Sequence, residues 1–350
     1  MQHFTAHRLT FSTQAVDNVE LNEHQGSALR GALFHALRRK FCAFARQQEV
    51  ECSACVLAQT CPVATLVSTL DPHHARGQDR PRPFTIQPPI VAGAGLNSSS
   101  GSASFTGHYW EREDGTGVFR YEPGEALTFG LTLYAQAMRL FPYVVLALQE
   151  FEEGGLGRKY EQYEGRWWRG RLQVREIWAE NPLTGERQPV LRQGSRQVQV
   201  PEVPVTHEQI ERRAQDEGAR ARAALSGHAS PSDPSPLTLY FLTPTRLVEG
   251  GHLLKPENFR FRPFFQRLLE RLEALSEAFS DTPLGVDFPA LLEAAEGVRV
   301  VERRLAWEDL CSYSTRRHAE SPLGGLVGGV TLEAEDWTPF LPWLLWGQFT

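Results

Sequence analysis

The sequence has very little lysine and no excess of positive charge. Only Lys40, Lys159 and Lys255 are lysines among 36 basic residues, all the others are arginines, and the formal net charge of the 350 residues is −6. Non-specific DNA-binding proteins are usually strongly basic, so this balance argues against a nucleic-acid partner. Arginine, however, can hold phosphate through two parallel hydrogen bonds and stack on bases. A GC-rich genome would also explain the arginine excess, but not its clustering.

Long apolar runs are also missing. No run reaches the roughly 18 residues that a membrane span needs, and the start, MQHFTAHRLTFST, has neither the charged beginning nor the apolar stretch of a signal peptide. We therefore expect a cytoplasmic protein with no membrane partner. The length of 350 residues, with 41% hydrophobic and 22% charged residues, is typical of a soluble two-domain protein.

Cysteine is scarce except in one segment. Four of the five cysteines lie within twenty residues, at Cys42, Cys52, Cys55 and Cys61. Four thiolates match tetrahedral zinc and can also hold an iron–sulfur cluster. We favour a structural zinc over a cluster; the alternative is four reduced thiols without metal. Four thiolates leave no open position for water, so we expect no cofactor for catalysis.

Strand and helix patterns follow the same order in both halves. The first half predicts strands at 4–13 and 170–178, two more within 118–134, and helices at 23–44 and 135–152. The second half predicts strands at 237–243, 298–307 and 330–334, and helices at 257–279 and 337–346. The order β-α-β-β-α-β, read twice, predicts an α+β protein with two tandem ferredoxin-like domains. The last strand of the second domain is missing.

Composition places the domain boundaries. Residues 1–180 form the predicted N-terminal ferredoxin-like domain, which includes a cysteine-cluster insertion (42–61) and a flexible Pro-, Gly- and Ser-rich loop (71–117). Residues 181–235 form a polar linker that ends in SGHASPSDPSP. Residues 236–350 form the C-terminal ferredoxin-like domain.

Several strings resemble one family. They are HQGSALRGALFHALRR (24–39), CSACVLAQTCPV (52–63), TPTRLVEGG (243–251) and, most specifically, WEDLCSYSTRRHAESPLGGLVGGVTLEAEDWTPFLPWL (307–344). With these strings the chain resembles the CRISPR-associated repeat-RNA endoribonucleases of the RAMP superfamily, the Cas-six family. The likeness runs through nearly the whole sequence.

The resemblance implies an enzyme that cuts CRISPR repeat RNA without metal, by attack of the 2′-hydroxyl, to give mature guide RNAs with a 2′,3′-cyclic phosphate end. CRISPR repeat RNA and other CRISPR effector subunits are the implied partners. Family members continue into a further strand and a glycine-rich loop, which this sequence lacks. That difference keeps two alternatives open: a non-catalytic RNA-binding RAMP subunit of an effector complex, or an inactive truncated remnant. A zinc-stabilised protein-interaction module is a third alternative.

The resemblance also places a catalytic histidine around the first helix. His24 and His35 lie there; His24 stands at the helix start and is the less favoured of the two, and Arg39 follows His35 one turn later on the same face. Histidine can transfer a proton near neutral pH, and a cation can hold the phosphate. We predict His35 as the proton-transfer residue, Arg39 or Lys40 as its phosphate partner, and Arg38 as an RNA contact. The alternative is a helical histidine without a chemical role.

Glycine-rich segments and arginines supply the other predicted RNA contacts. The segments GGLGRK (154–159) and PLGGLVGG (322–329) would let backbone approach phosphate, and the resemblance implies that the second one cradles the repeat RNA. Ordinary turns are the alternative. Residues 158–175 interleave arginines with aromatic residues, which suits base stacking unless the aromatic side chains face the core. The predicted contacts are Arg158, Lys159, Arg166, Arg169, Arg316, Arg317, His318, Gly324, Gly325 and Gly328.

Overall fold

The structure is a computed structural model. It describes residues 4–23, 25–45, 52–69, 81–90, 106–112, 115–163, 165–225, 235–280, 284–314 and 319–350. No helix in these ranges is both long and apolar enough to cross a membrane.

The first half is built around strand β1 (Thr5–Ala15), the centre of an antiparallel sheet. β1 pairs with β6 (Ala126–Tyr134) on one side and with β9 (Leu172–Asn181) on the other. β3 (Phe84–Gln87) and β10 (Glu186–Leu191) extend the sheet to the order β10-β9-β1-β6-β3. Alternate residues of β1, such as Leu9 and Phe11, are fully buried, as the two-residue period of a half-covered strand requires.

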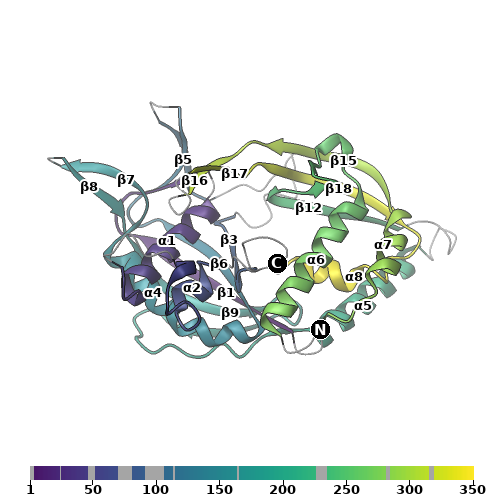
Figure 1. Ribbon diagram of the computed structural model, residues 1–350, viewed down its shortest axis with the longest axis horizontal. Helices are drawn as coiled ribbons and strands as arrows, with labels where there is room; N and C mark the ends of the chain where they lie inside the picture. Colours follow the sequence, from purple (N-terminus) through teal and green to yellow (C-terminus); the bar gives the residue numbers. More distant parts are fainter. Residues whose placement is uncertain are drawn as a thin grey trace.

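Helices α1 (Gln25–Phe41) and α4 (Phe141–Glu153) pack against each other beside this sheet (Figure 1). Their apolar residues recur at helical spacing and point into one core. This core contains Leu29, Leu33 and Leu37 of α1 and Val144, Leu148 and Phe151 of α4. The chain order β1-α1-β3-β6-α4-β9 with the spatial order β9-β1-β6-β3 is the ferredoxin-like arrangement, which confirms the predicted fold class.

The second half repeats this arrangement. β12 (Ser235–Thr245), β18 (Gly325–Ala334) and β15 (Arg299–Glu308) form an antiparallel sheet in the order β12-β18-β15. α6 (Phe261–Phe279) follows β12, and α8 (Leu341–Gly347) follows β18. In the described part of the chain no strand pairs with the outer edge of β12, so this sheet has three of the four ferredoxin-like strands.

Smaller elements surround the two sheets. Hairpin β7–β8 and the small sheet containing β5 project from one end of the molecule (Figure 1). The bounds are β2 Val19–Asn22, β4 His108–Glu111, β5 Gly117–Tyr121, β7 Leu156–Tyr163, β8 Arg166–Gly170, α2 Pro62–Leu66, β13 Val248–Glu249, β14 His252–Leu253, α7 Phe288–Glu296, β16 Cys311–Ser314 and β17 Ala319–Pro322. Among the described residues, short 3-10 helices cover Cys52–Ala54, Ala135–Leu140 and Pro256–Asn258.

The segment 181–235, predicted as a polar linker, contains regular structure. It includes β10, β11 (Val205–Thr206) and α5 (His207–Leu225). Although α5 is mostly polar, Ile210 and Ala214 stand one turn apart and are buried in the core of the second half. The ion pair Arg212–Glu208 stabilises its exposed face. A narrow apolar stripe is therefore enough to pack this helix.

The segment 71–117, predicted as a flexible loop, also contains strands. β3 pairs with β6, and β4 pairs with β5. β3 is only four residues long and stands among prolines, which is why its pattern was too short to recognise. Residues 70–80, 91–105 and 113–114 lie outside the described residues.

Aromatic side chains join the two halves. Phe4, at the start of the first sheet, stacks on Tyr134 with ring centres 5.9 Å apart and meets the edge of Trp346 at 5.2 Å. The Tyr134 hydroxyl donates to the Phe349 carbonyl, and the Thr85 hydroxyl donates to the same carbonyl at 3.1 Å. Burial raises the pKa of Tyr134 to about 12, so its hydroxyl stays protonated. The ends of β1 and β6 are thus part of the second half's core.

We predict that Tyr134→Phe lowers the free energy of unfolding by about 1 kcal/mol, because it removes a buried hydrogen bond across this junction. Urea denaturation measures the change. Tyr143→Phe is the matched control, since the Tyr143 hydroxyl forms no hydrogen bond with a described residue. If both variants lowered the free energy of unfolding by the same amount, the hydrogen bond from Tyr134 to the Phe349 carbonyl would contribute nothing to stability.

Candidate catalytic cluster and nucleic-acid interface

His35 lies on the solvent-exposed side of α1, while its neighbours Leu33 and Leu37 are buried in the core. Partial burial of the ring and the positive charges of Arg169, Arg39 and Arg38 lower the pKa of His35. Each of these effects disfavours the imidazolium. The imidazole is therefore neutral at neutral pH and can accept a proton.

Two cations next to His35 in the sequence are attached to α4. Arg39 Nε donates to Glu150 Oε2 at 2.8 Å, and Lys40 Nζ donates to Gln149 Oε1 at 3.3 Å. The Arg39 side chain remains 48% exposed, so part of its guanidinium is still accessible to a ligand. The charge of Arg39 lowers the pKa of His35, whereas Lys40 is not among the charges that act on this ring. The geometry favours Arg39 as the phosphate partner.

Arg169 approaches His35 from strand β8. Its Nη1 donates to the Gly157 carbonyl, and burial together with the charge of Arg39 lowers the pKa of Arg169. Arg169 forms no ion pair with any described residue. Arg39 and Arg169 thus place two guanidinium groups beside one neutral imidazole. Such a group of like charges favours the binding of an anion.

The first glycine segment positions β7 against its neighbours. Gly155 and Gly157 have φ of +64° and +83°, which favour glycine. A side chain at Gly155 would stand 2.5 Å from the Arg169 carbonyl, and one at Gly157 would stand 2.2 Å from the Glu20 carbonyl. These glycines therefore support the hairpin that carries Arg169, in line with the turn alternative for this segment.

The hairpin β7–β8 presents aromatic residues to solvent. Trp167 and Trp168 are 60% and 49% exposed, so they do not face the core. Lys159 is exposed on the paired strand, whereas Arg158 is half-buried and its Nη1 is buried without a hydrogen-bond partner among the described residues. The Arg166 side chain lies outside the described residues. Exposed indole rings beside cations match the arrangement that stacks single-stranded bases.

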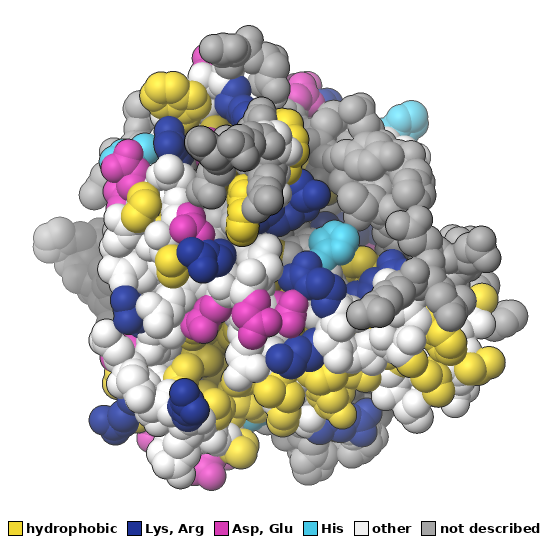
Figure 2. All heavy atoms as spheres, turned by 90° about the vertical axis from the view of Figure 1, so that its left-hand side faces the viewer, with side chains coloured by type: hydrophobic (Ala, Val, Ile, Leu, Met, Phe, Trp, Pro, Cys, Tyr) yellow, Lys and Arg dark blue, Asp and Glu magenta, His cyan; other side chains and the backbone are white. Residues whose placement is uncertain are grey.

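Figure 2 shows the end of the molecule that lies on the left in Figure 1. Near the middle of this face several Lys and Arg side chains surround a histidine, and acidic side chains lie next to them (Figure 2). The negative total charge therefore coexists with a local group of cations.

A pocket of about 740 Å³ lies between the two halves. Its walls come from the start of α1, the edge strand β3 and one face of α6. Four arginines line it, at Arg30, Arg82, Arg267 and Arg271, against a single acidic side chain, Glu270. This is the shared cationic surface that two ferredoxin-like halves can offer to a ligand.

Both parts of the chain match known families. Residues 4–203 match the AF_1859 N-terminal domain family, and residues 239–350 match the family described as CRISPR-associated endoribonuclease Cas6. Residues 239–350 therefore form a domain of the Cas6 family. No curated protein matches the sequence.

Solved structures of Cas6-containing assemblies share the fold. A chain of a partial Cas6-RT-Cas1–Cas2 complex aligns with 99% of this chain at a TM-score of 0.52 and 12% identity, and a chain of the Cas6-RT-Cas1–Cas2 complex gives the same values. The alignments cover 43% and 27% of those longer chains, so this chain spans less than half of either. A Cas6 product complex aligns over 99% of this chain and 93% of its own at 15% identity and a TM-score of 0.46.

Most of the second glycine-rich segment lies in strand β18 of this Cas6-family domain, and not in a turn or loop. Gly324 directly precedes β18, and Gly325 and Gly328 lie within it. A side chain at Gly325 would stand 2.6 Å from the Thr245 backbone, and Gly328 has φ of +103°. These glycines permit close packing of the central strand, and RNA contact by them stays a prediction. The predicted contacts Arg316, Arg317 and His318 lie outside the described residues.

The structure does not bring the four clustered cysteines together as a set of metal ligands. Cys42, Cys52, Cys55 and Cys61 are free of disulfides and half-buried, and three of them pack against the core of the first half. In the part of the chain that is described, which includes all four, no three His, Cys, Asp or Glu side chains lie close enough to hold a metal ion. The geometry gives no support to a structural zinc, which stays a prediction.

Sequence reasoning missed two features of the site. It assigned Arg169 to RNA binding alone and did not place it beside His35, because a hairpin and a helix far apart in the sequence come together only in the fold. It also missed the arginines of α6, although Arg267 and Arg271 stand one turn apart on one helix face. That spacing was the signal available in the sequence.

We predict that Arg169→Gln raises the pKa of His35 towards the ordinary value of about 6.5, because a positive charge near the ring is lost. Titration of the His35 ring protons by NMR measures the shift. Arg187→Gln is the control, since Arg187 pairs with Glu180 at the other edge of the first sheet. If His35 titrated identically in Arg169→Gln and in the parent, the charge of Arg169 would not act on His35, and the two residues would not belong to one cluster.

Proposed function

We propose that this chain cleaves CRISPR repeat RNA without a metal ion, by attack of a 2′-hydroxyl on the adjacent phosphate, and so produces mature guide RNAs. The observation that carries the proposal is a neutral histidine beside two guanidinium groups on an exposed face of a chain that has a Cas6-family domain. The proposal extends to other CRISPR-associated subunits as partners, since the solved structures that share the fold are of Cas6-RT-Cas1–Cas2 assemblies.

The reaction needs one proton acceptor and a stabilised phosphate. His35 removes the proton from the 2′-hydroxyl, and the oxygen attacks the phosphorus to form the new P–O bond. The bond to the 5′-oxygen breaks, and this leaving oxygen takes a proton from water. The hydroxide that remains takes the proton from the His35 imidazolium, so His35 returns to its neutral form. The products are a 2′,3′-cyclic phosphate and a 5′-hydroxyl.

The two guanidinium groups stabilise the phosphate as negative charge increases on it. Arg39 stays partly free beside its bond to Glu150, and Arg169 has no carboxylate partner among the described residues. Charge-assisted hydrogen bonds of this kind are stronger than neutral ones. Because both groups are held in place before the substrate binds, little reorganisation is needed during the reaction.

The exposed indoles of the hairpin would hold the strand that enters the site. Trp167 and Trp168 are on β8, the strand that also carries Arg169. A base stacked on either ring would place the neighbouring phosphates close to the cations. Stacking of this type is worth about 1–3 kcal/mol per base.

We expect His35→Ala to slow cleavage of the repeat RNA at least about a hundredfold in the presence of EDTA, because the proton acceptor is lost. Single-turnover rates on labelled RNA measure the effect, and RNA affinity should change little. His252→Ala, an exposed histidine on hairpin β13–β14, is the control and should cleave normally. If His35→Ala still cleaved the RNA at the parent's rate, His35 would have no part in the mechanism. If the parent lost its activity in EDTA and regained it with magnesium, the reaction would not be metal-free.

The pH profile gives a second prediction. Because partial burial and the nearby arginines lower the pKa of His35, the neutral base persists below the usual histidine range. The single-turnover rate should therefore fall with acid only at a midpoint below about pH 6.5. Arg169→Gln should move this midpoint upwards. A midpoint above the ordinary histidine value would contradict the assignment.

A further inference from the structure

Strand β4 exposes two large aromatic side chains at the edge of a small sheet. It is the end strand in the order β2-β5-β4, and no described strand pairs with its outer edge. All four residues of β4 are exposed, and Tyr109 and Trp110 are each 57% exposed. Tyrosine and tryptophan are enriched at interfaces, and a free strand edge offers backbone hydrogen bonds to a further strand. This edge is therefore a candidate docking surface.

The neighbouring strand holds both rings in place. Tyr109 packs edge-to-face against Phe119 with ring centres 5.6 Å apart, and its hydroxyl donates to Glu23 Oε1 at 3.2 Å. Trp110 lies opposite Val118, which is fully buried. Because successive residues of a strand point to opposite faces, one ring borders each face of the sheet. A strand added to this edge would contact both rings through alternate side chains.

The charges around Tyr109 are negative and unpaired. Glu111 is exposed two residues further along β4, on the same face as Tyr109. Gly117 lies opposite Glu111, and a side chain there would stand 2.2 Å from Glu23 Oε1, so the glycine leaves room for this carboxylate. Desolvation and the charges of Glu23 and Glu111 raise the pKa of Tyr109. Neither carboxylate forms an ion pair with a described residue.

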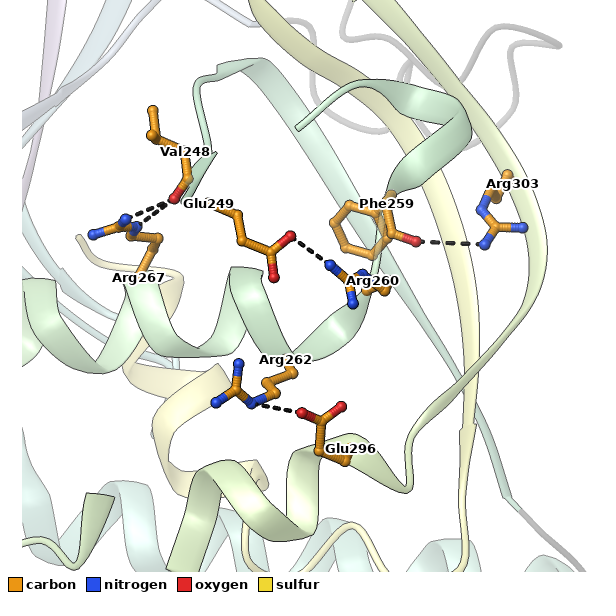
Figure 3. A network of polar contacts seen from close by, with 8 residues as sticks. All are labelled: Val248, Glu249, Phe259, Arg260, Arg262, Arg267, Glu296 and Arg303. Atoms are coloured by element: carbon orange, nitrogen blue, oxygen red, sulfur yellow. Dashed lines mark hydrogen bonds and ion pairs between the residues drawn. The ribbon is translucent and has the colours of Figure 1, made fainter. Parts of the chain in front are cut away.

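Carboxylates elsewhere on the surface are paired with arginines. Glu249 accepts from Arg260 at 2.5 Å, and Glu296 accepts from Arg262 at 2.8 Å (Figure 3). Such pairs account for the charges as supports of the fold. The two carboxylates beside Tyr109 lack this explanation, so their charge is available to a cation from outside the chain.

The cations of the small sheet lie on its other face, with Trp110. Arg112 pairs with Glu20 at 3.3 Å, and His108 pairs with Glu125 at 2.8 Å. Arg120 is half-buried between Glu20 and His108 on the neighbouring strands. Among the described residues of this sheet, no Lys, Arg or His side chain lies on the Tyr109 face. The Tyr109 face is thus acidic and the Trp110 face is balanced in charge.

The neighbouring hairpin β7–β8 has the opposite character. Its exposed indoles accompany Lys159 and Arg169, and β2 contacts strands of both hairpins. Both hairpins project from the same end of the molecule (Figure 1). The cationic hairpin suits RNA, whereas Glu23 and Glu111 would repel phosphate. An aromatic ring beside carboxylates instead suits a guanidinium or ammonium group.

We propose that the free edge of β4 binds an extended, arginine- or lysine-containing segment of a partner protein as an additional strand. Backbone groups of β4 form hydrogen bonds with this segment. A basic side chain of the segment lies against the Tyr109 ring and pairs with Glu111, and the next side chain, which is apolar, packs on Trp110. The surface lies outside the catalytic cluster, so the inference goes beyond RNA cleavage and does not depend on it.

Peptide binding tests the proposal on the full chain. The probe is a fluorescein-labelled peptide of arginine–valine repeats, and fluorescence anisotropy measures its affinity. We expect Glu111→Gln and Trp110→Ala each to weaken binding about tenfold, because each removes one contact of the added strand. Glu202→Gln, which makes the same change of charge on an exposed residue beyond β10, is the matched control and should keep the affinity of the parent. A peptide of glutamate–valine repeats should bind at least about tenfold more weakly than the arginine–valine peptide.

RNA assays separate the two hairpins. Trp110→Ala should unfold at the temperature of the parent and cleave the repeat RNA at the parent's rate. Trp167→Ala should weaken RNA binding and leave the affinity for the arginine–valine peptide unchanged. This opposite pattern would assign RNA to β7–β8 and the basic peptide to β4, and it holds for the peptide even if the chain cleaves no RNA.

Three outcomes would overturn the proposal. The first is an arginine–valine peptide that does not bind the parent, or that binds the parent, Glu111→Gln and Trp110→Ala equally. The second is a loss of RNA binding, and not of peptide binding, in Trp110→Ala, which would make the edge of β4 an RNA surface. The third is a dimer of the parent in analytical ultracentrifugation that Trp110→Ala dissociates, which would make a second copy of this chain the occupant.

Discussion

The packing of Phe4 against both Tyr134 and Trp346 is the contact on which the rest of the molecule depends. It inserts the ends of two strands of the first sheet into the core of the second half. The hydrogen bond from Tyr134 to the Phe349 carbonyl adds direction to this apolar contact. Because interiors are tightly packed, the two halves cannot shift freely against each other. These contacts bring the start of α1, strand β3 and helix α6 together as the walls of the pocket between the halves.

Local pairing of charges explains how a chain with a net charge of −6 can present cationic surfaces. Many of its carboxylates are bound to arginines that support the fold, as in Arg171–Asp17 and Arg187–Glu180. Arg169 and Arg271 lack such partners among the described residues. Their charges remain available to an anionic ligand. The local distribution of ion pairs therefore matters more for anion binding than the total charge of the chain does.

The sequence predicted the parts of the fold that depend on local periodicity. The apolar spacing of α1 and α6 and the alternation of β1 were sufficient to predict two ferredoxin-like halves. Short or narrow signals were missed. β3 has only four residues, and α5 packs through Ile210 and Ala214 alone among its described buried residues.

The candidate site could be predicted only in part, because its members meet through tertiary contacts. His35 and Arg39 share one helix and could be paired from their spacing, whereas Arg169 reaches them from a hairpin more than a hundred residues away. The spacing of the cysteines predicted zinc, but spacing does not determine whether four side chains converge. The glycines at 324–329 read as a loop because glycine is rare in strands, yet close packing of β18 requires them.

The most direct test of the account is the path of the RNA over the surface. Repeat RNA with 4-thiouridine at single positions can be cross-linked to the protein by ultraviolet light, and mass spectrometry then identifies the attached peptides. The account predicts cross-links to β8, at Trp167 or Trp168, and to the peptide of α1 that carries His35. Cross-links confined to α5 and α7, on the other side of α6, would contradict it.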